Sequence, residues 1–429
     1  MDQTQAEAMK IEAEAILRRH ATRNFWLNVL DGTAFVFGVS MISRFTVLPL
    51  FVARLSSERW VQGLLPMIAQ TGWALPPLFM APLIASLPRR KPFIMVVTLG
   101  ERLPMLALGL VLLFAPGLAP NTLLTIFFAL FAIQMLSGGL IVTAWQDFVA
   151  RLIPERRWGT FFGLQLGSGG VLGVIGAALA GTVLAAWPFP QNIGLLALLC
   201  FAAMVLSYIF MLCTIEPPQP APPREPLRAF LGGVLPLLRR DRSFRGYLFC
   251  RAAIALGLVG HSFLTAAALE RFSPSEAEIG LFTGTLLASQ ALCNLGLGAL
   301  ADRWGHKQVL ELSTGVGMVA LLLAFMAPSV GWYLPIFILV GAAQAGYQLS
   351  GFTLVLRFST PENRPAYIGV ANTMLAPVAM LGPLAAGLLA ELTSYGALFV
   401  TLTLIGLAGL AALHWRVPIP HGAAQASGG

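Results

Sequence analysis

Several ionisable side chains stand inside long apolar stretches of this chain, where a charge is costly unless it is paired, hydrated or used. An arginine can bind a carboxylate or a phosphate through parallel hydrogen bonds. A histidine can exchange a proton near neutral pH, although a lone one is more often a hydrogen-bonded core residue. Each is therefore a functional candidate by default: Asp31, Arg44, Glu101, Arg102, Asp147, Arg251 and His261.

Two pairs among them suggest structural roles. Glu101 and Arg102 are adjacent, and we interpret them as a buried pair that holds one helix to its neighbours. Asp147 and Arg151 are four residues apart, the spacing of an ion pair along one helix face. We expect both pairs to anchor helices.

Arg44 has no evident acidic partner. Asp31 precedes it by thirteen residues, which is about 20 Å along a helix. We expect Asp31 to neutralise Arg251, which lies at its own depth, and Arg44 to be hydrated or hydrogen-bonded. Our hypothesis is that Arg44 meets an anionic or electron-rich group of a substrate. The alternative is that it reaches the outer headgroups as an anchor.

Uncharged hydrogen-bonding residues gather on two further apolar stretches. Gln344, Tyr347 and Gln348 share one helix face, and Gln134 shares a face with Ser137. Amides beside aromatic rings suit an organic solute with polar edges better than a bare ion.

The elements that carry these residues must lie in a bilayer. Of the 429 residues 57% are hydrophobic and 11% are charged, with a mean hydropathy of +0.77. A soluble domain cannot cover that much apolar surface. Each helix that crosses the membrane needs about 20 apolar residues. The sequence predicts an all-α membrane protein with twelve such runs, at 25–53, 61–87, 93–114, 123–149, 160–186, 193–213, 247–268, 279–300, 309–326, 333–356, 367–390 and 397–415.

The distribution of Lys and Arg predicts the orientation. Basic residues follow the second, fourth, eighth, tenth and twelfth runs, whereas 115–121, 187–192 and 327–331 carry no charge. By the positive-inside rule both termini are cytoplasmic, in a plasma (inner) membrane. The net charge of +8 is spread over short loops, so it does not indicate nucleic acid as a partner.

A turn between the eighth and ninth runs, residues 298–307, carries a moderately specific pattern. It resembles the G-x-x-x-D-R-x-G-R-K turn of the major facilitator superfamily, with its matching residues at Gly298, Asp302, Arg303, Gly305 and Lys307. We expect Gly305 to permit the backbone turn, Asp302 to cap a neighbouring helix, and the basic residues to face phosphate headgroups.

An internal repeat supports the resemblance. Residues 154–157 match 361–364 at an offset of 207, and 81–90 align with 298–307 at an offset of 217. In the first copy Ala85 and Ser86 replace the acidic and basic pair, and only Arg89 and Arg90 keep the basic end. The resulting domains are a cytoplasmic tail (1–24), a six-helix half (25–214), a linker with an amphipathic helix at 227–238 (215–245), a second six-helix half (246–416) and a cytoplasmic tail (417–429).

The resemblance implies two pseudo-symmetric halves that rock around a site at the middle of the membrane. In the family, helices one, four, seven and ten line the central cavity, which selects Asp31, Arg44, Arg251 and His261. Glycines in runs five and eleven imply that these two helices pack closely against the opposite half. The helices either slide during rocking or stay in static contact.

Enzymatic functions are not indicated. No lysine follows a glycine, so the phosphate-binding G-K-[ST] is missing, and no H-E-x-x-H, G-x-S-x-G or C-x-x-C occurs. We expect no cofactor and no metal, and a functional monomer. The predicted function is secondary transport of a small organic solute, with proton-coupled export and import of an anionic metabolite both open. The alternative is a non-transporting scaffold, assembly factor or receptor with the same fold.

Overall fold

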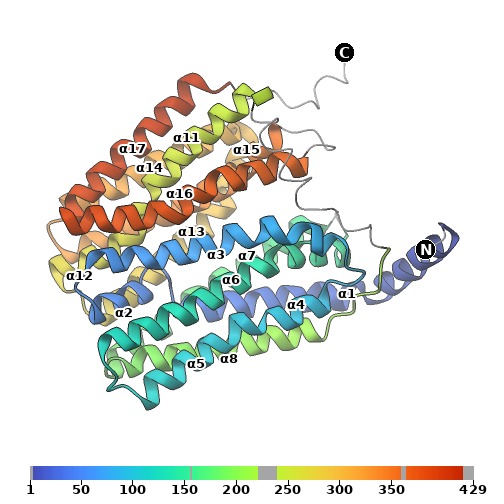
Figure 1. Ribbon diagram of the computed structural model, residues 1–429, viewed down its shortest axis with the longest axis horizontal. Coiled ribbons are helices and arrows are strands. Elements are labelled where there is room, and N and C mark those ends of the chain that lie inside the picture. The colour runs from blue at the N-terminus through green and yellow to red at the C-terminus, as the bar shows by residue number, and fades with distance from the viewer. Residues whose placement is uncertain (1–2, 155–156, 221–238, 359–363, 419–429) are drawn as a thin grey trace. The chain divides into compact units, whose positions relative to one another are not determined.

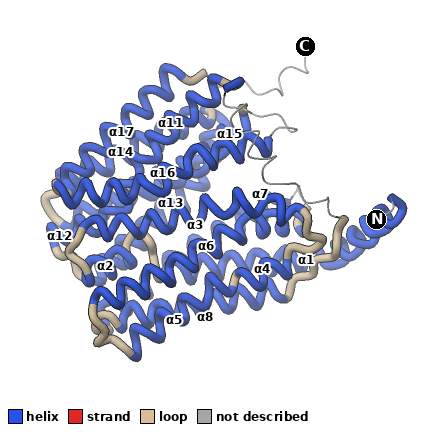
Figure 2. Tube along the Cα trace, viewed as in Figure 1, coloured by secondary structure: helices blue, strands red, loops and turns tan. Residues whose placement is uncertain are grey.

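The computed structural model describes residues 3–154, 157–220, 239–358 and 364–418, and within these ranges it contains helices and loops but no strand (Figures 1 and 2). The helices are, in order, α1 (Gln3–Met41), α2 (Val47–Leu55), α3 (Arg59–Ala85), α4 (Lys91–Val97), α5 (Leu99–Phe114), α6 (Pro120–Leu152), α7 (Trp158–Ala186), α8 (Gln191–Leu212), α11 (Arg242–Leu258), η2 (Val259–Phe263), α12 (Leu264–Phe272), α13 (Glu276–Trp304), α14 (His306–Met326), η3 (Val330–Trp332), α15 (Tyr333–Arg357), α16 (Arg364–Leu392) and α17 (Tyr395–Arg416). The predicted amphipathic helix at 227–238 lies outside the described residues.

Within the described residues, nine spans are long and apolar enough to cross a membrane. The three remaining predicted runs coincide with α1 plus α2, with α3 and with α13. The all-α fold class is confirmed, and the helices are consistent with twelve crossings. The predicted tail does not form a separate element, because α1 runs without interruption from Gln3 into the first apolar run.

Among the described residues three crossings are interrupted. The first crossing breaks between α1 and α2, at residues 42–46, and the seventh crossing changes to the 3-10 helix η2 between α11 and α12. The third crossing has a one-residue break at Thr98, between α4 and α5. The offset of 217 between the halves relates the breaks in the first and seventh crossings, since 44 plus 217 is 261. Interruptions at corresponding positions of two transporter repeats are a pointer to a binding site.

The chain divides into two compact units, and the division differs from the predicted halves. One unit comprises Met1–Ile42 and Gly72–Leu227, and the other comprises Ser43–Thr71 and Arg228–Gly429. The segment Ser43–Thr71, which holds α2 and the start of α3, therefore groups with the C-terminal half. In the first unit α1 packs on α7 and α8; in the second α15 packs on α13 and α14, and α11 on α17.

In each unit a lysine at a basic turn ties two helices together. Lys91 donates its Nζ to the carbonyl oxygens of Leu212 (2.7 Å) and Thr214 (2.7 Å) at the end of α8. Lys307 donates to the carbonyl oxygens of His414 (3.1 Å) and Val417 (3.0 Å) at the end of α17. Each ammonium satisfies carbonyls that a helix C-terminus leaves without partners.

Glycine is required at two places in the second unit. Gly305 has a φ of 101° in the turn between α13 and α14, a conformation that other residues resist. At Gly63 of α3, an added Cβ would lie 2.5 Å from the carbonyl oxygen of Pro383 in α16. On the other side of the same contact, a Cβ added to Gly387 would lie 3.1 Å from Cα of Trp60. We call this contact between α3 and α16 the glycine seam; its glycines leave room for backbone to meet backbone.

Candidate functional site

Arg44 lies in the break of the first crossing and is exposed. Its side chain lines a small recess whose other residues come from the same break, from α3 and from η2: Phe45, Leu65, Pro66, Ala69, Gln70 and Ser262. The guanidinium carbon lies 5.2 Å from the centre of the Phe45 ring. No described carboxylate lies within ion-pair distance of Arg44.

The break is held open by hydrogen bonds to the C-terminal half. Thr265 donates its hydroxyl to the carbonyl oxygen of Phe45 at 2.6 Å, and the hydroxyls of Thr46 and Thr283 share a short hydrogen bond. Both contacts satisfy polar groups that an apolar environment would otherwise leave unpaired. The break is therefore a built feature, which sets Arg44 in a fixed place.

His261 lies in the corresponding break of the seventh crossing, but it is buried. Its Nε2 lies 3.1 Å from the carbonyl oxygen of Gly317 in α14. A Cβ added to Gly317 would lie 3.1 Å from Cε1 of His261, so the ring packs tightly on α14. This geometry resembles a hydrogen-bonded core residue more than a proton carrier.

Further inward, Arg251 of α11 and Tyr347 of α15 face each other. The guanidinium carbon lies 5.8 Å from the centre of the Tyr347 ring. Gln348 is exposed and Gln344 is half-buried on the same helix as Tyr347. The predicted polar face of α15 therefore includes side chains that a solute could reach.

Asp31 and Gln134 belong to the other unit, and both are buried. Asp31 accepts a hydrogen bond from Ser207 at 2.6 Å, and Arg102 donates to the same hydroxyl at 3.1 Å. Glu101 lies 3.7 Å from Arg102, which also donates to the carbonyl oxygen of Met204. We expected Asp31 to neutralise Arg251, but the structure engages it in this network of its own unit.

The turn around Arg90 in the first unit has an ion-paired network. Asp147 pairs with Arg90 at 2.6 Å and with Arg151 at 3.0 Å. Burial lowers the pKa of the Arg90 guanidinium, and the Asp147 carboxylate opposes this shift. Glu216 accepts from the backbone amides of Arg90 and Lys91 at 2.9 and 2.8 Å. Arg89 is exposed.

The corresponding turn of the second unit differs from the expectation in one respect. Arg303 is exposed and free to face headgroups, whereas Lys307 is engaged by the end of α17. The surroundings of Gly298 and the side chain of Asp302 lie outside what the structure describes. The proposed helix cap at Asp302 therefore stays a prediction.

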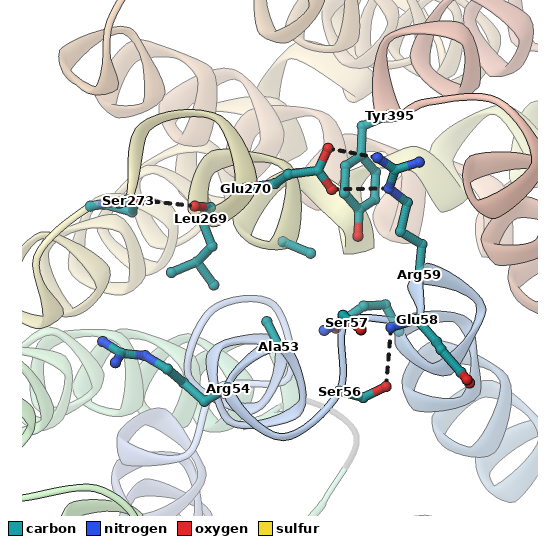
Figure 3. Close-up of a pocket in the computed structure, with 13 residues that line it drawn as sticks. Ala53, Arg54, Ser56, Ser57, Glu58, Arg59, Leu269, Glu270, Ser273 and Tyr395 are labelled. Carbon is teal, nitrogen blue, oxygen red and sulfur yellow. Dashed lines mark hydrogen bonds and ion pairs between the residues drawn. The ribbon is translucent and has the colours of Figure 1, made fainter.

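A pocket of about 420 Å³ with charged side chains in its wall lies where Ser43–Thr71 meets α12 and α17 (Figure 3). The Arg59 side chain extends across the pocket and forms an ion pair with Glu270, with Nε–Oε2 and Nη2–Oε1 distances of 2.9 and 2.8 Å. The backbone amide of Arg59 also donates to Glu391, and Arg54 pairs with Glu276 at 3.2 Å. The hydrogen bond to Glu270 raises the pKa of Arg59.

Our sequence analysis missed these outer residues. A signal was present, because opposite charges occur at 54–59 and at 270–278, whereas three other outer loops carry none. Their pairing could not be read from the sequence, since 211 residues separate Arg59 from Glu270. Among the described residues, no group of three or more His, Cys, Asp or Glu could hold a metal ion.

Comparison with known proteins defines the class. The family model described as Major Facilitator Superfamily matches residues 252–429. A structure of the nucleoside transporter NupG has a TM-score of 0.68 at 13% identity, covering 92% of this chain and 98% of that chain. A POT family transporter in complex with a thioalcohol-conjugated peptide has a TM-score of 0.69 at 11% identity, with 92% and 95% covered. The E. coli fucose:proton symporter FucP has a TM-score of 0.59 at 16% identity, with 92% and 98% covered.

The family model covers the second half of the chain, and the three structures show that the whole chain shares the fold of these transporters. No curated protein matches its sequence. At these identities the structural likeness gives the fold, and the substrates of the similar proteins remain properties of those proteins.

Proposed function

We propose that this protein is a secondary transporter that carries a small organic solute across the plasma membrane by alternating access. The observation that carries the proposal is the pair of interrupted crossings at corresponding positions, with the exposed Arg44 in one of them. Broken helices present polar backbone and side chains at the depth where transporters bind solutes. Both termini are cytoplasmic, and the protein works as a monomer.

The Arg44 recess is nearly closed in this conformation, with a volume of about 10 Å³, and the residue types that line it favour an organic solute over a bare ion once it opens. A guanidinium, an amide, a hydroxyl and an aromatic ring face it, from Arg44, Gln70, Ser262 and Phe45. Small-molecule sites combine a few placed polar groups with apolar walls in this way. Arg44 would meet an anionic or electron-rich group of the solute.

Coupling to protons is a further part of the proposal. Asp31 and Glu101 are two carboxylates within the membrane region of the first unit, and each belongs to the network of Arg102. A carboxylate that shares a network with a single arginine can gain or lose a proton as the network rearranges. Export of an amphipathic compound and import of an anionic metabolite are both compatible with it.

A purified-protein assay tests the site. A screen of organic solutes by thermal stabilisation identifies ligands, and counterflow into proteoliposomes tests transport of the best one. We expect Arg44→Gln to lose binding while its melting temperature without ligand stays close to the wild-type value. Arg271→Gln is the matched control, because that arginine is exposed and outside the recess.

Wild-type affinity in Arg44→Gln would make Arg44 an anchor. A protein that binds solutes but shows no counterflow would favour the second candidate, a non-transporting scaffold or receptor with this fold.

A further inference from the structure

Arg251 has no carboxylate partner among the described residues. It is half-buried in α11. Its Nε is fully buried and has no hydrogen-bond acceptor among the described residues. A desolvated guanidinium with an unused donor costs free energy that an arriving anion would recover.

Arg251 packs against one face of α15. The centre of the Tyr347 ring lies 5.8 Å from the guanidinium carbon. Four residues further along the same helix, Gly351 lets the guanidinium approach closely, since an added Cβ would lie 3.2 Å from Nη2 and 3.4 Å from Nε. Tyr247 donates to the carbonyl oxygen of Gly351 at 2.9 Å and fixes that backbone. We call Arg251, Tyr247, Tyr347 and Gly351 the arginine cradle.

Arg251 and Arg44 cannot share one anionic group. Ser262 lines the Arg44 recess and lies eleven residues beyond Arg251 on the same crossing. At about 1.5 Å per residue this separation is roughly 17 Å. The cradle is therefore a second position, deeper along the seventh crossing than the recess.

We propose that the arginine cradle binds the carboxylate or phosphate group of the transported solute, so that the solute is an organic anion. The inference rests on the proposed transport function. A guanidinium presents parallel N–H groups that match the oxygens of either anion, and the Tyr347 face accepts an adjoining apolar or planar body. The half-exposed Gln344 and the exposed Gln348 extend the polar surface beside it.

The test uses purified full-length protein and three probe anions, acetate, benzoate and inorganic phosphate, at matched ionic strength. Benzamide is the neutral partner of benzoate. We expect at least one anion, and not benzamide, to raise the melting temperature. Arg251→Gln should lower the affinity for that anion about tenfold or more, which is the loss expected for one hydrogen-bonded contact to a charged group. Arg251→Lys should keep part of the affinity.

Gly351→Ala provides a second variant that keeps the charge. Its methyl group displaces the guanidinium, so anion affinity should fall although Arg251 is present. Gly315→Ala is the matched control, because nothing lies within 4 Å of an added Cβ there. If either cradle variant fails to fold, the other still tests the proposal.

Three results would overturn the proposal: no stabilisation by any of the anions, equal stabilisation by benzoate and benzamide, or full anion affinity in Arg251→Gln. Protein in phosphatidylglycerol and phosphatidylcholine nanodiscs distinguishes a lipid headgroup from a solute. An Arg251-dependent stabilisation by phosphatidylglycerol alone would assign the cradle to lipid. Counterflow of a neutral solute would overturn the anionic substrate and leave the transport function intact.

Discussion

Arg59 and Glu270 form a two-pronged ion pair across the outer pocket, with N–O distances of 2.9 and 2.8 Å (Figure 3). Arg59 opens α3, and Glu270 lies near the end of α12. Arg59 also donates to the carbonyl oxygen of Ala390 at 2.9 Å. One residue of the segment Ser43–Thr71 thus holds two separate elements of the C-terminal half. The alternating access that we propose would require this contact to open.

Removing the pair should loosen that contact. We expect Arg59→Gln to favour the opened form by about 1 kcal/mol, or roughly fivefold, because both partners are partly exposed and water screens the pair. The reporter is a cysteine at Val61, which is buried in this conformation, in protein without the four native cysteines. The measurement is its rate of modification by a maleimide.

Arg54→Gln is the control for this experiment, since Arg54 has a single longer contact of 3.2 Å with Glu276. The double variant Arg59→Glu with Glu270→Arg should restore slow modification. Identical rates in wild type and Arg59→Gln would rule out a latch at this pair.

The glycine seam should respond to one added methyl group. Gly63→Ala places a Cβ 2.5 Å from the carbonyl oxygen of Pro383, so α3 and α16 must move apart. We expect faster modification of the Val61 cysteine and a lower melting temperature. Gly315→Ala should neither speed modification of the Val61 cysteine nor lower the melting temperature. Its added Cβ has no atom within 4 Å, and alanine stabilises a helix by about 0.5–1 kcal/mol relative to glycine. Equal behaviour of the two variants would contradict a close-packed seam.

Lys91 should stabilise the first unit more than its neighbour Arg89. Lys91→Met leaves the carbonyl oxygens of Leu212 and Thr214 without their ammonium donor. The expected cost is about 1–3 kcal/mol, seen as a lower melting temperature in detergent. Arg89→Met serves as the control, since Arg89 is exposed. Melting temperatures that fall equally in both variants would point to a general effect of basic charge.

The orientation predicted from the basic residues is tested by cysteine labelling in intact cells. A cysteine at Pro88, beside Arg89 and Arg90, should react with a membrane-permeant maleimide and resist an impermeant one. A cysteine at Gly117, in a loop without charge, should react with both. The reverse pattern would place the termini outside.

Much of the fold follows from local properties of the sequence. Runs of apolar residues predicted the helices, and basic turns predicted where they end, because a bilayer demands an unbroken apolar stretch whatever its neighbours are. The offset of 217 related the two halves. It also relates Arg44 to His261, although the sequence did not show that the helix is broken at each.

The partners of the charged side chains could not be predicted from the sequence. Asp31 is engaged by Ser207, 176 residues away, and not by the arginine at its predicted depth. The ammonium of Lys307 donates hydrogen bonds to carbonyl oxygens at the end of α17, whereas we expected it to contact lipid headgroups. In a soluble helix an apolar stripe shows which face is buried, but a membrane helix is apolar on nearly every face.

The sequence by itself therefore determined the class of protein, the helices and the list of ionisable residues at membrane depth. Only the tertiary structure decided that Asp31 and His261 have hydrogen-bond partners, and that Arg44 and Arg251 have no carboxylate within ion-pair distance among the described residues. The physical reason is that the hydropathy of a segment depends only on its own residues. Whether a charged side chain finds a partner depends on which faces of different helices come into contact.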